Sequence, residues 1–201
     1  MAPRPYNSTV RKDAEEETVR RIVAATVALH AEKGTMATTH AEIAERAGVS
    51  IPTVYKYFPT RNSLLPACIG EVARDAPHID PARILTAPDI DTRLILLVDA
   101  VHDHYRYFHP WFRWTAIDAQ YLPEIAEAVE TGQQQLATLV KTVLADTVAN
   151  EIPAEVLALT QVLLDYPAWQ RLNELLGTPE AVNQATVHVL RLIIFPLYES
   201  E

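Results

Sequence analysis

The sequence predicts an all-α protein made of two helical domains. Apolar residues recur with a period near 3.6 through most of the 201-residue chain, and capping residues and prolines separate the periodic stretches. Five glycines stand against fourteen prolines, and the alternating β-branched runs typical of strands are few. A hydrophobic fraction of 49% with 21% charged residues favours a folded chain with a large core over disorder.

The first element in the chain is a basic, proline-containing tail over residues 1–13, for which no regular structure is predicted. This tail either aids solubility or reaches the DNA backbone or minor groove. Asp13 and Glu16 have the spacing of a capping box, which predicts a helix to about Lys33 that Gly34 ends. The inward-facing positions of this helix are Val19, Ile22, Val23, Thr26 and Leu29.

Two short helices joined by a tight turn are predicted at residues 39–58. Thr39 and Glu42 have the spacing of a capping box, which starts the first helix at residue 40. Gly48 stands where a left-handed residue ends a helix. The second helix runs from residue 50 or 51 to residue 57, and Phe58-Pro59 ends it because a residue before proline disfavours helical backbone.

The second of these helices is polar on the side that its core residues leave outward. Val54 and Phe58 are i, i+4 partners that face inward, so hydroxyls, an amine and aromatic edges face outward. Such a face after a tight turn is typical of a helix-turn-helix that reads the major groove; the alternative is a helical hairpin with a polar surface. The predicted DNA-contacting residues are Thr39, His40, Ser50, Ile51, Pro52, Thr53, Tyr55, Lys56, Tyr57 and Arg61.

The next helix is capped by Thr60 and runs to about Arg74. Arg61 lies in its first turn, where free backbone N–H groups and the helix dipole favour a phosphate. The inward positions are Leu64, Leu65, Cys68 and Val72.

The run TTHAEIAERAGVSIPTVYKYFPTRNSLL resembles the DNA-binding segment of the TetR family of transcriptional regulators, and the resemblance covers about Glu15 to Val72. Two positions depart from the family pattern. His40-Ala41 stands where a basic residue is common, and Arg61 stands where lysine is usual. The resemblance implies an N-terminal three-helix DNA-binding domain, a C-terminal helical domain for ligand binding and dimerisation, and binding of a palindromic operator as a homodimer.

The charge distribution supports this division. The net charge of −9 separates into +1 over residues 1–75 and −10 over residues 76–201. The single cysteine, Cys68, cannot form an internal disulfide, and the N-terminus has no apolar region of a signal peptide. No apolar run approaches 18 residues. A cytoplasmic protein without a membrane partner is therefore expected.

Residues 76–201 are predicted to form the second domain, after a proline-rich linker at 75–89 with one short helical turn. Prolines and glycines bound the predicted helices: 91–109, ended by Pro110; an aromatic-rich segment ended by Pro123; and helices over 124–150, 153–165, 167–176 and 179–195.

Aromatic residues gather around Pro110, and they form either a plain core or a ligand pocket. As a pocket for a small apolar or aromatic effector, the candidate lining is His104, Tyr105, Phe108, Trp111, Trp114, Asp118, Tyr121, Tyr166 and Trp169. The last helix is apolar on two sides, so it needs cover on both, either from a partner chain or, as a plain core helix, from its own domain. The resemblance implies a dimer at the last two main helices, through Val156, Leu159, Leu163, Val182, Ala185, Val189, Leu192 and Ile193.

Catalytic chemistry is not predicted. Asp99, His102 and Asp103 share a helix face that suits a divalent metal, but a solvated polar face is the favoured interpretation. No metal, cofactor or catalytic residue is therefore expected. The predicted function is a transcriptional regulator, in the form of a repressor released from its operator by an effector. The alternatives are an activator, and a helical small-molecule-binding protein or enzyme whose first domain mediates protein contacts.

Overall fold

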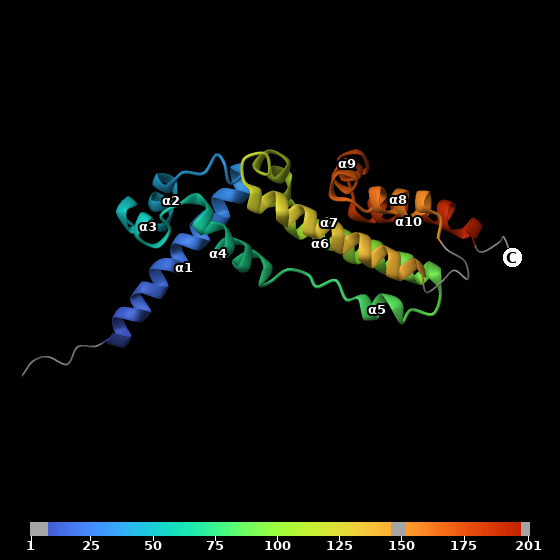
Figure 1. Ribbon diagram of the computed structural model, residues 1–201, viewed down its shortest axis with the longest axis horizontal. Helices are drawn as coiled ribbons and strands as arrows, with labels where there is room; N and C mark the ends of the chain where they lie inside the picture. The colour runs from blue at the N-terminus through green and yellow to red at the C-terminus, as the bar shows by residue number, and fades with distance from the viewer. Residues whose placement is uncertain (1–7, 146–151, 198–201) are drawn as a thin grey trace, which may run out of the picture. The chain divides into compact units, whose positions relative to one another are not determined.

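The computed structural model describes residues 8–145 and 152–197, and the regular secondary structure in these ranges is helical (Figure 1). The predicted all-α class is confirmed. No helix in the described ranges is long and apolar enough to cross a membrane. The helices are α1 (Ser8–Lys33), α2 (His40–Ala47), α3 (Ile51–Tyr57), α4 (Arg61–Ala73), α5 (Pro81–Leu85), α6 (Ile90–Asp118), α7 (Pro123–Ala145), α8 (Ala154–Leu163), α9 (Tyr166–Leu176) and α10 (Pro179–Ile194), with a 3-10 turn at Phe195–Leu197.

The chain divides into two compact units. The first is Met1–Asp75 with Arg113–Ile125, and the second is Ala76–Phe112 with Ala126–Glu201. The break after residue 75 coincides with the predicted linker. The assignment of residues 113–125 to the first unit has no counterpart in the sequence analysis.

Helix α1 begins earlier than its predicted start at Asp13. It starts at Ser8, and Asp13 lies inside it. Two ion pairs at i, i+4 spacing join the added turns to the rest of the helix: Arg11 to Glu15 at 3.6 Å and Lys12 to Glu16 at 3.7 Å. The tail expectation for residues 8–13 is therefore wrong, and residues 1–7 lie outside the described part of the chain.

The caps predicted for the following helices are all present. The Thr39 hydroxyl accepts the N–H of Glu42, and the Glu42 carboxylate accepts the N–H of Thr39 at 3.0 Å. Gly48 ends α2 with a φ of +64°, a backbone conformation that favours glycine. Thr60 caps α4. The first unit closes over a core of Ile22, Val23, Ala25, Leu29, Ile43, Ala44, Ala47, Val54, Phe58, Leu64 and Cys68.

The last turn of α6 binds the loop between α1 and α2, within the first unit. The buried carboxylate of Asp118 accepts the N–H of Thr35 at 2.7 Å and the N–H of Met36 at 3.0 Å. Arg113 and Trp114 donate to the carbonyl of Ala31, at 2.7 Å and 3.1 Å. These hydrogen bonds fix the end of α1 and the entry to α2. We call the contact between Asp118 and these two N–H groups the Asp118 clamp.

Two residues close to the clamp are set by their surroundings. Gly34 has a φ of +83°, and a Cβ there would lie 3.1 Å from the Trp114 Cβ, so this position requires glycine. Burial lowers the pKa of His30 to about 4, although the nearby Asp118 carboxylate acts in the opposite direction. His30 is therefore neutral near pH 7.

Helix α6 runs through Pro110, where the sequence predicts a break. A proline inside a helix removes one backbone hydrogen bond and crowds the preceding turn. One aromatic contact spans the proline in this case, because the rings of Phe108 and Phe112 stack with their centres 5.1 Å apart. The ring centre of His104 lies 4.5 Å from that of Phe108 and extends the row on the N-terminal side of the proline. Contacts along the helix face thus offset the lost hydrogen bond.

The second unit is a helical bundle with its own core. Its buried residues come from every helix of the unit, namely Ile84, Leu94, Leu97, Val98, Val101, Tyr105, Val140, Val143, Leu144, Val156, Leu164, Trp169, Val182, Val187, Leu190 and Ile194. Arg191 on α10 and Asp91 at the start of α6 form a two-contact ion pair across the bundle.

The Asp118 clamp predicts a specific loss of stability. Asp118→Ala leaves the buried N–H of Thr35 and the part-buried N–H of Met36 without their acceptor, so we expect the free energy of unfolding to fall by about 3 kcal/mol. Urea denaturation followed by circular dichroism measures this change. Glu124→Gln is the control, because Glu124 accepts from Asn62 on the exposed surface of the same unit. Equal midpoints for the two variants would show that the clamp does not stabilise the unit.

Candidate nucleic-acid interface

Helix α3 is held in place by its caps and by two buried side chains. Ser50 caps its N-terminus by accepting the N–H of Thr53, and Pro52 lies in the first turn, as predicted. Val54 is 0% exposed and Phe58 is 8% exposed, so both anchor the helix to the core of the first unit. This anchoring leaves the opposite side of α3 free to face a ligand as large as a duplex.

The outward face of α3 carries most of the predicted DNA-contacting residues. Tyr55 and Ile51 are 51% and 45% exposed, Lys56 and Pro52 are exposed, and Thr53 and Tyr57 are half-buried. The hydroxyls of Ser50 and Thr53 lie 2.7 Å apart. These side chains offer hydroxyl donors and acceptors, an amine and an aromatic edge on one surface. This is the chemistry that base edges and phosphates require.

His40, on α2, supports this face from the side. Its ring stacks on the ring of Tyr55 with centroids 4.4 Å apart and an interplanar angle of 4°. Its Nε2 lies 3.0 Å from the carbonyl oxygen of Phe58, and since a carbonyl only accepts, Nε2 donates. His40 therefore positions Tyr55 and joins the end of α3 to α2. The Thr39 hydroxyl is exposed but already engaged in the cap of α2.

The Lys56 amine makes three contacts, with two residues of the first unit. It donates to the Tyr57 hydroxyl at 3.2 Å, lies 4.5 Å from the centre of the Tyr57 ring, and lies 3.6 Å from the Glu15 carboxylate on α1. The hydrogen bond to Tyr57 and the nearby Glu15 raise the pKa of Lys56. Lys56 is thus cationic and held along α3, and Glu15 is placed to compete with DNA for it.

Two further contacts of the interface were missed by the sequence analysis. Arg21 on α1 donates to the carbonyl of Gly48 at 2.9 Å and so holds the turn between α2 and α3. Arg46 on α2 pairs with Glu32 on α1 through two contacts, at 2.5 Å and 2.9 Å. No local pattern could reveal pairs that are 27 and 14 residues apart in sequence. Arg61 is half-buried at the start of α4, with its guanidinium 3.5 Å from the Met36 sulfur.

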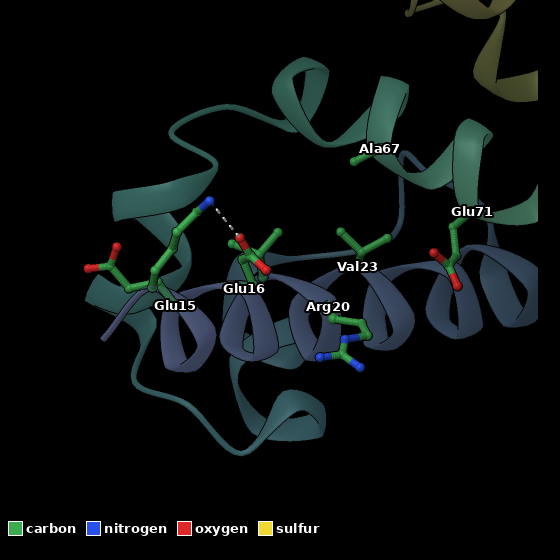
Figure 2. Close-up of a pocket in the computed structure, with 8 residues that line it drawn as sticks. Glu15, Glu16, Arg20, Val23, Ala67 and Glu71 are labelled. Carbon is green, nitrogen blue, oxygen red and sulfur yellow. Dashed lines mark ion pairs between the residues drawn. The ribbon is translucent and has the colours of Figure 1, made fainter. Parts of the chain in front are cut away.

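The first unit also has a groove of about 500 Å³ between α1 and α4 (Figure 2). Val19, Val23 and Ala67 form its apolar floor. Charged residues surround the floor, namely Lys12, Glu15, Glu16, Arg20 and Glu71. Glu15 lines the groove and also pairs with Lys56, so this one carboxylate borders both the groove and α3.

The effector candidates divide between the two units. In the second unit, five of them form what we call the aromatic cluster, which consists of His104, Tyr105, Phe108, Tyr166 and Trp169. Trp111 is half-buried beside Tyr107, with ring centres 6.2 Å apart. Trp114, Asp118 and Tyr121 belong to the first unit. Asp118 and Trp114 make the contacts with the α1–α2 segment described above, and Tyr121 is 63% exposed.

The aromatic cluster is closely packed. Tyr105 is 8% exposed and donates its hydroxyl to the carbonyl of Leu164 at 2.9 Å, and burial raises its pKa. The Tyr166 hydroxyl lies 2.8 Å from Nδ1 of His109. The second groove, of about 370 Å³, lies on α7 beside Pro81 and is not lined by the cluster. Within the described ranges, no group of three or more His, Cys, Asp or Glu residues is placed to hold a metal ion.

The predicted dimer residues are partly surface and partly core. Leu159, Val189 and Leu192 are 49%, 38% and 62% exposed, whereas Val156 and Val182 are 8% and 0% exposed. The buried pair packs inside its own unit, so a partner chain cannot contact it directly. Leu163, Ala185 and Ile193 are half-buried. Val162 on α8 is also exposed, at 64%.

The geometry of α2 and α3 is that of a helix-turn-helix, and comparisons with known proteins show what this segment is similar to. The family model described as bacterial regulatory proteins, tetR family, matches residues 22–68. The HTH-type transcriptional repressor KstR of Rhodococcus jostii (strain RHA1) is 38% identical over 68 residues, which are 34% of this chain and 31% of KstR. The chain spans between 31% and 40% of the length of three curated relatives that it matches.

Solved structures extend the likeness in fold to most of the chain. A TetR transcription regulator from Haloarcula marismortui ATCC 43049 matches with a TM-score of 0.64 and 17% identity, over 90% of this chain and 98% of that chain. The transcriptional regulator FadR from Bacillus subtilis, in complex with stearoyl-CoA, matches with a TM-score of 0.60 and 15% identity, over 88% and 97%. At these identities the likeness is one of fold. Residues 22–68 are therefore similar to the DNA-binding segment of TetR-family regulators, and most of the chain shares the fold of such proteins. A family of regulatory proteins agrees with the prediction that it is not an enzyme.

The pair between Glu15 and Lys56 predicts a gain of DNA affinity when it is broken. Glu15→Gln removes the competing carboxylate, so we expect binding to duplex DNA at low salt to tighten by about two- to fivefold. Fluorescence anisotropy with a labelled duplex measures the Kd. Glu16→Gln, which loses the neighbouring pair with Lys12, controls for the change in net charge. If both variants tighten binding equally, the gain comes from the change in net charge and not from breaking the pair between Glu15 and Lys56.

Proposed function

We propose that this protein is a transcriptional repressor that binds a palindromic operator as a homodimer and is released by a small apolar or aromatic effector. The observation that carries the DNA-binding role is the outward face of α3, where Thr53, Tyr55 and Lys56 project from a helix anchored by Val54 and Phe58. The match of residues 22–68 to the tetR family model and the similarity of this segment to the repressor KstR support the same role.

The residues of the interface divide by their chemistry. Thr53 and Lys56 lie on the recognition helix and are assigned to base edges, whereas Tyr55 and Arg61 are assigned to phosphates. The stack of His40 on Tyr55 restricts the position of the phenol. Arg61 stands in the first turn of α4, where the helix dipole and free N–H groups favour an anion.

The test of the DNA-binding role is a gel shift with the chain's own upstream DNA across a salt series, with random duplex as competitor. Thr53→Ala and Lys56→Ala are expected to change the preferred sequence, because each base contact contributes about 1–3 kcal/mol of discrimination. Tyr55→Phe and Arg61→Ala are expected to weaken all sequences alike. Arg171→Ala is the control, since Arg171 pairs with Glu174 on the exposed surface of the second unit. A folded dimer that shifts no upstream fragment would overturn the proposal.

The proposed dimer uses the exposed apolar surface of α8 and α10. Leu159, Val162, Val189 and Leu192 are the residues we assign to it, in place of the buried Val156 and Val182. Ala185, Leu163 and Ile193 flank this surface. Exposed apolar side chains on two helices that pack together within one unit are the pattern of a protein–protein contact. A dimer also suits a palindromic operator, because its symmetry presents two α3 helices to two half-sites.

Leu192→Asp is therefore expected to convert the dimer to a monomer and to weaken operator binding at least tenfold. A charge in the centre of an apolar interface has no partner and loses its hydration. Analytical ultracentrifugation measures the mass. Leu175→Asp is the matched control, because Leu175 on α9 is 63% exposed, nearly the same as Leu192. A monomeric wild type, or a dimeric Leu192→Asp variant, would contradict this surface assignment.

The proposed effector response passes through α6. This helix carries three residues of the aromatic cluster, and its last turn carries Asp118 and Trp114, which bind the segment before α2. An effector that shifts α6 would change the clamp, and with it the position of α2 and α3. We accordingly assign Trp114 and Asp118 to transmission rather than to the effector site. The FadR complex supports an apolar effector, because a protein of this fold binds stearoyl-CoA.

A further inference from the structure

A chain of hydrogen bonds joins α6 to α10 inside the second unit. The Asp99 carboxylate accepts from Nδ2 of Asn183 at 2.6 Å, and Oδ1 of Asn183 lies 2.7 Å from Nδ1 of His102. An ionised carboxylate only accepts, so it fixes the orientation of the Asn183 amide. The amide oxygen therefore faces His102, and Nδ1 of His102 must carry the proton. Asp99 and Asn183 thus set the tautomer of the imidazole.

The other ring nitrogen of His102 is then an acceptor. The side chain is 0% exposed, and burial lowers its pKa, so the ring is neutral near pH 7. Within the described part of the chain, Nε2 of His102 is buried without a hydrogen-bonding partner, and so is the hydroxyl of Thr160 on α8. Buried polar atoms are normally paired, because an unpaired one has lost its hydration without replacement.

Each of these two atoms belongs to a residue with apolar core residues beside it on its own helix. Val101 and Tyr105 flank His102 on α6, and Val156 and Leu164 flank Thr160 one turn away on each side, and all four belong to the core of the second unit. A site that is mostly apolar, with a few oriented polar groups, is the pattern of small-molecule recognition. The sequence suggested His102 only as a metal ligand. With its proton on Nδ1, His102 can instead accept a hydrogen bond at Nε2.

We propose that His102 determines the specificity of the effector site by accepting a hydrogen bond from the effector. The effector would be a small apolar molecule with a hydroxyl or N–H donor. Nε2 of His102 accepts this donor. The inference rests on the proposed function in one respect, namely that the second unit binds an effector.

The first test compares two probes of nearly equal size, phenol and toluene, which differ in the O–H donor. Calorimetry with the full-length protein is expected to show phenol binding at least about tenfold more tightly than toluene. His102→Phe is expected to remove this preference. His78→Phe is the control, because His78 is an exposed histidine of the same unit. Equal affinities for the two probes in the wild type, or a preference that survives in His102→Phe, would overturn the inference.

The second test needs no variant and so remains decisive if His102→Phe does not fold. In protein labelled with ¹⁵N-histidine, NMR is expected to show His102 protonated on Nδ1 and bare on Nε2. Phenol is expected to shift the Nε2 resonance, whereas toluene leaves it in place. A proton on Nε2 in the free protein, or a bound water at Nε2 that phenol does not displace, would overturn the inference.

Operator binding separates this inference from the proposed function. If the protein shifts its operator but shows no preference for phenol, the specificity role of His102 fails and the regulator role stands. If it binds phenol through His102 but shifts no DNA, the regulator role fails and the binding site stands.

Discussion

The Asp118 clamp is the interaction on which the first unit depends. The carboxylate of Asp118 accepts the consecutive backbone N–H groups of Thr35 and Met36. Asp118 lies on a helix more than 80 residues further along the chain. Both N–H groups lie between α1 and α2, where the chain has left one helix and not entered the next, so neither has a partner within a helix. A buried acceptor is needed there, and a charged one makes the stronger hydrogen bond.

The clamp also contributes to the orientation of α3 and of the surface that this helix presents. With the α1–α2 segment held, Arg21 can bind the Gly48 carbonyl and Val54 can fill the core, so α3 has one orientation. Its outward residues then need no role in folding and are free for recognition. Glu15 is the exception, because it pairs with Lys56 and so lowers the charge that α3 presents. The charge that α3 presents therefore depends on the position of Glu15 on α1.

The second unit shows a different balance between packing and polar groups. Its aromatic cluster is large enough to carry α6 through Pro110, a residue that ends most helices. The same helix contains Asp99 and His102, whose polar atoms are buried or half-buried among apolar side chains. Buried polar groups such as these lower the free energy of unfolding of a core, and proteins often retain them at binding sites.

The sequence by itself determined the elements whose causes are local. Thr39 with Glu42, Gly48, Thr60 and Phe58-Pro59 act within four residues of themselves, so the bounds of α2, α3 and α4 could be predicted closely, together with the outward face of α3. The start of α1 was misplaced because its i, i+4 ion pairs outweighed the capping pattern at Asp13.

Only the tertiary structure decided the features that depend on contacts between distant residues. In the folded protein α6 continues through Pro110, and Asp118 and Trp114 contact the α1–α2 segment. Val182 is buried, and Asn183 links Asp99 to His102 by hydrogen bonds. The physical reason is that periodicity shows which face of a helix is apolar or polar, but not which partner will cover it. That partner is chosen when the helices pack and every buried polar group competes for a hydrogen bond.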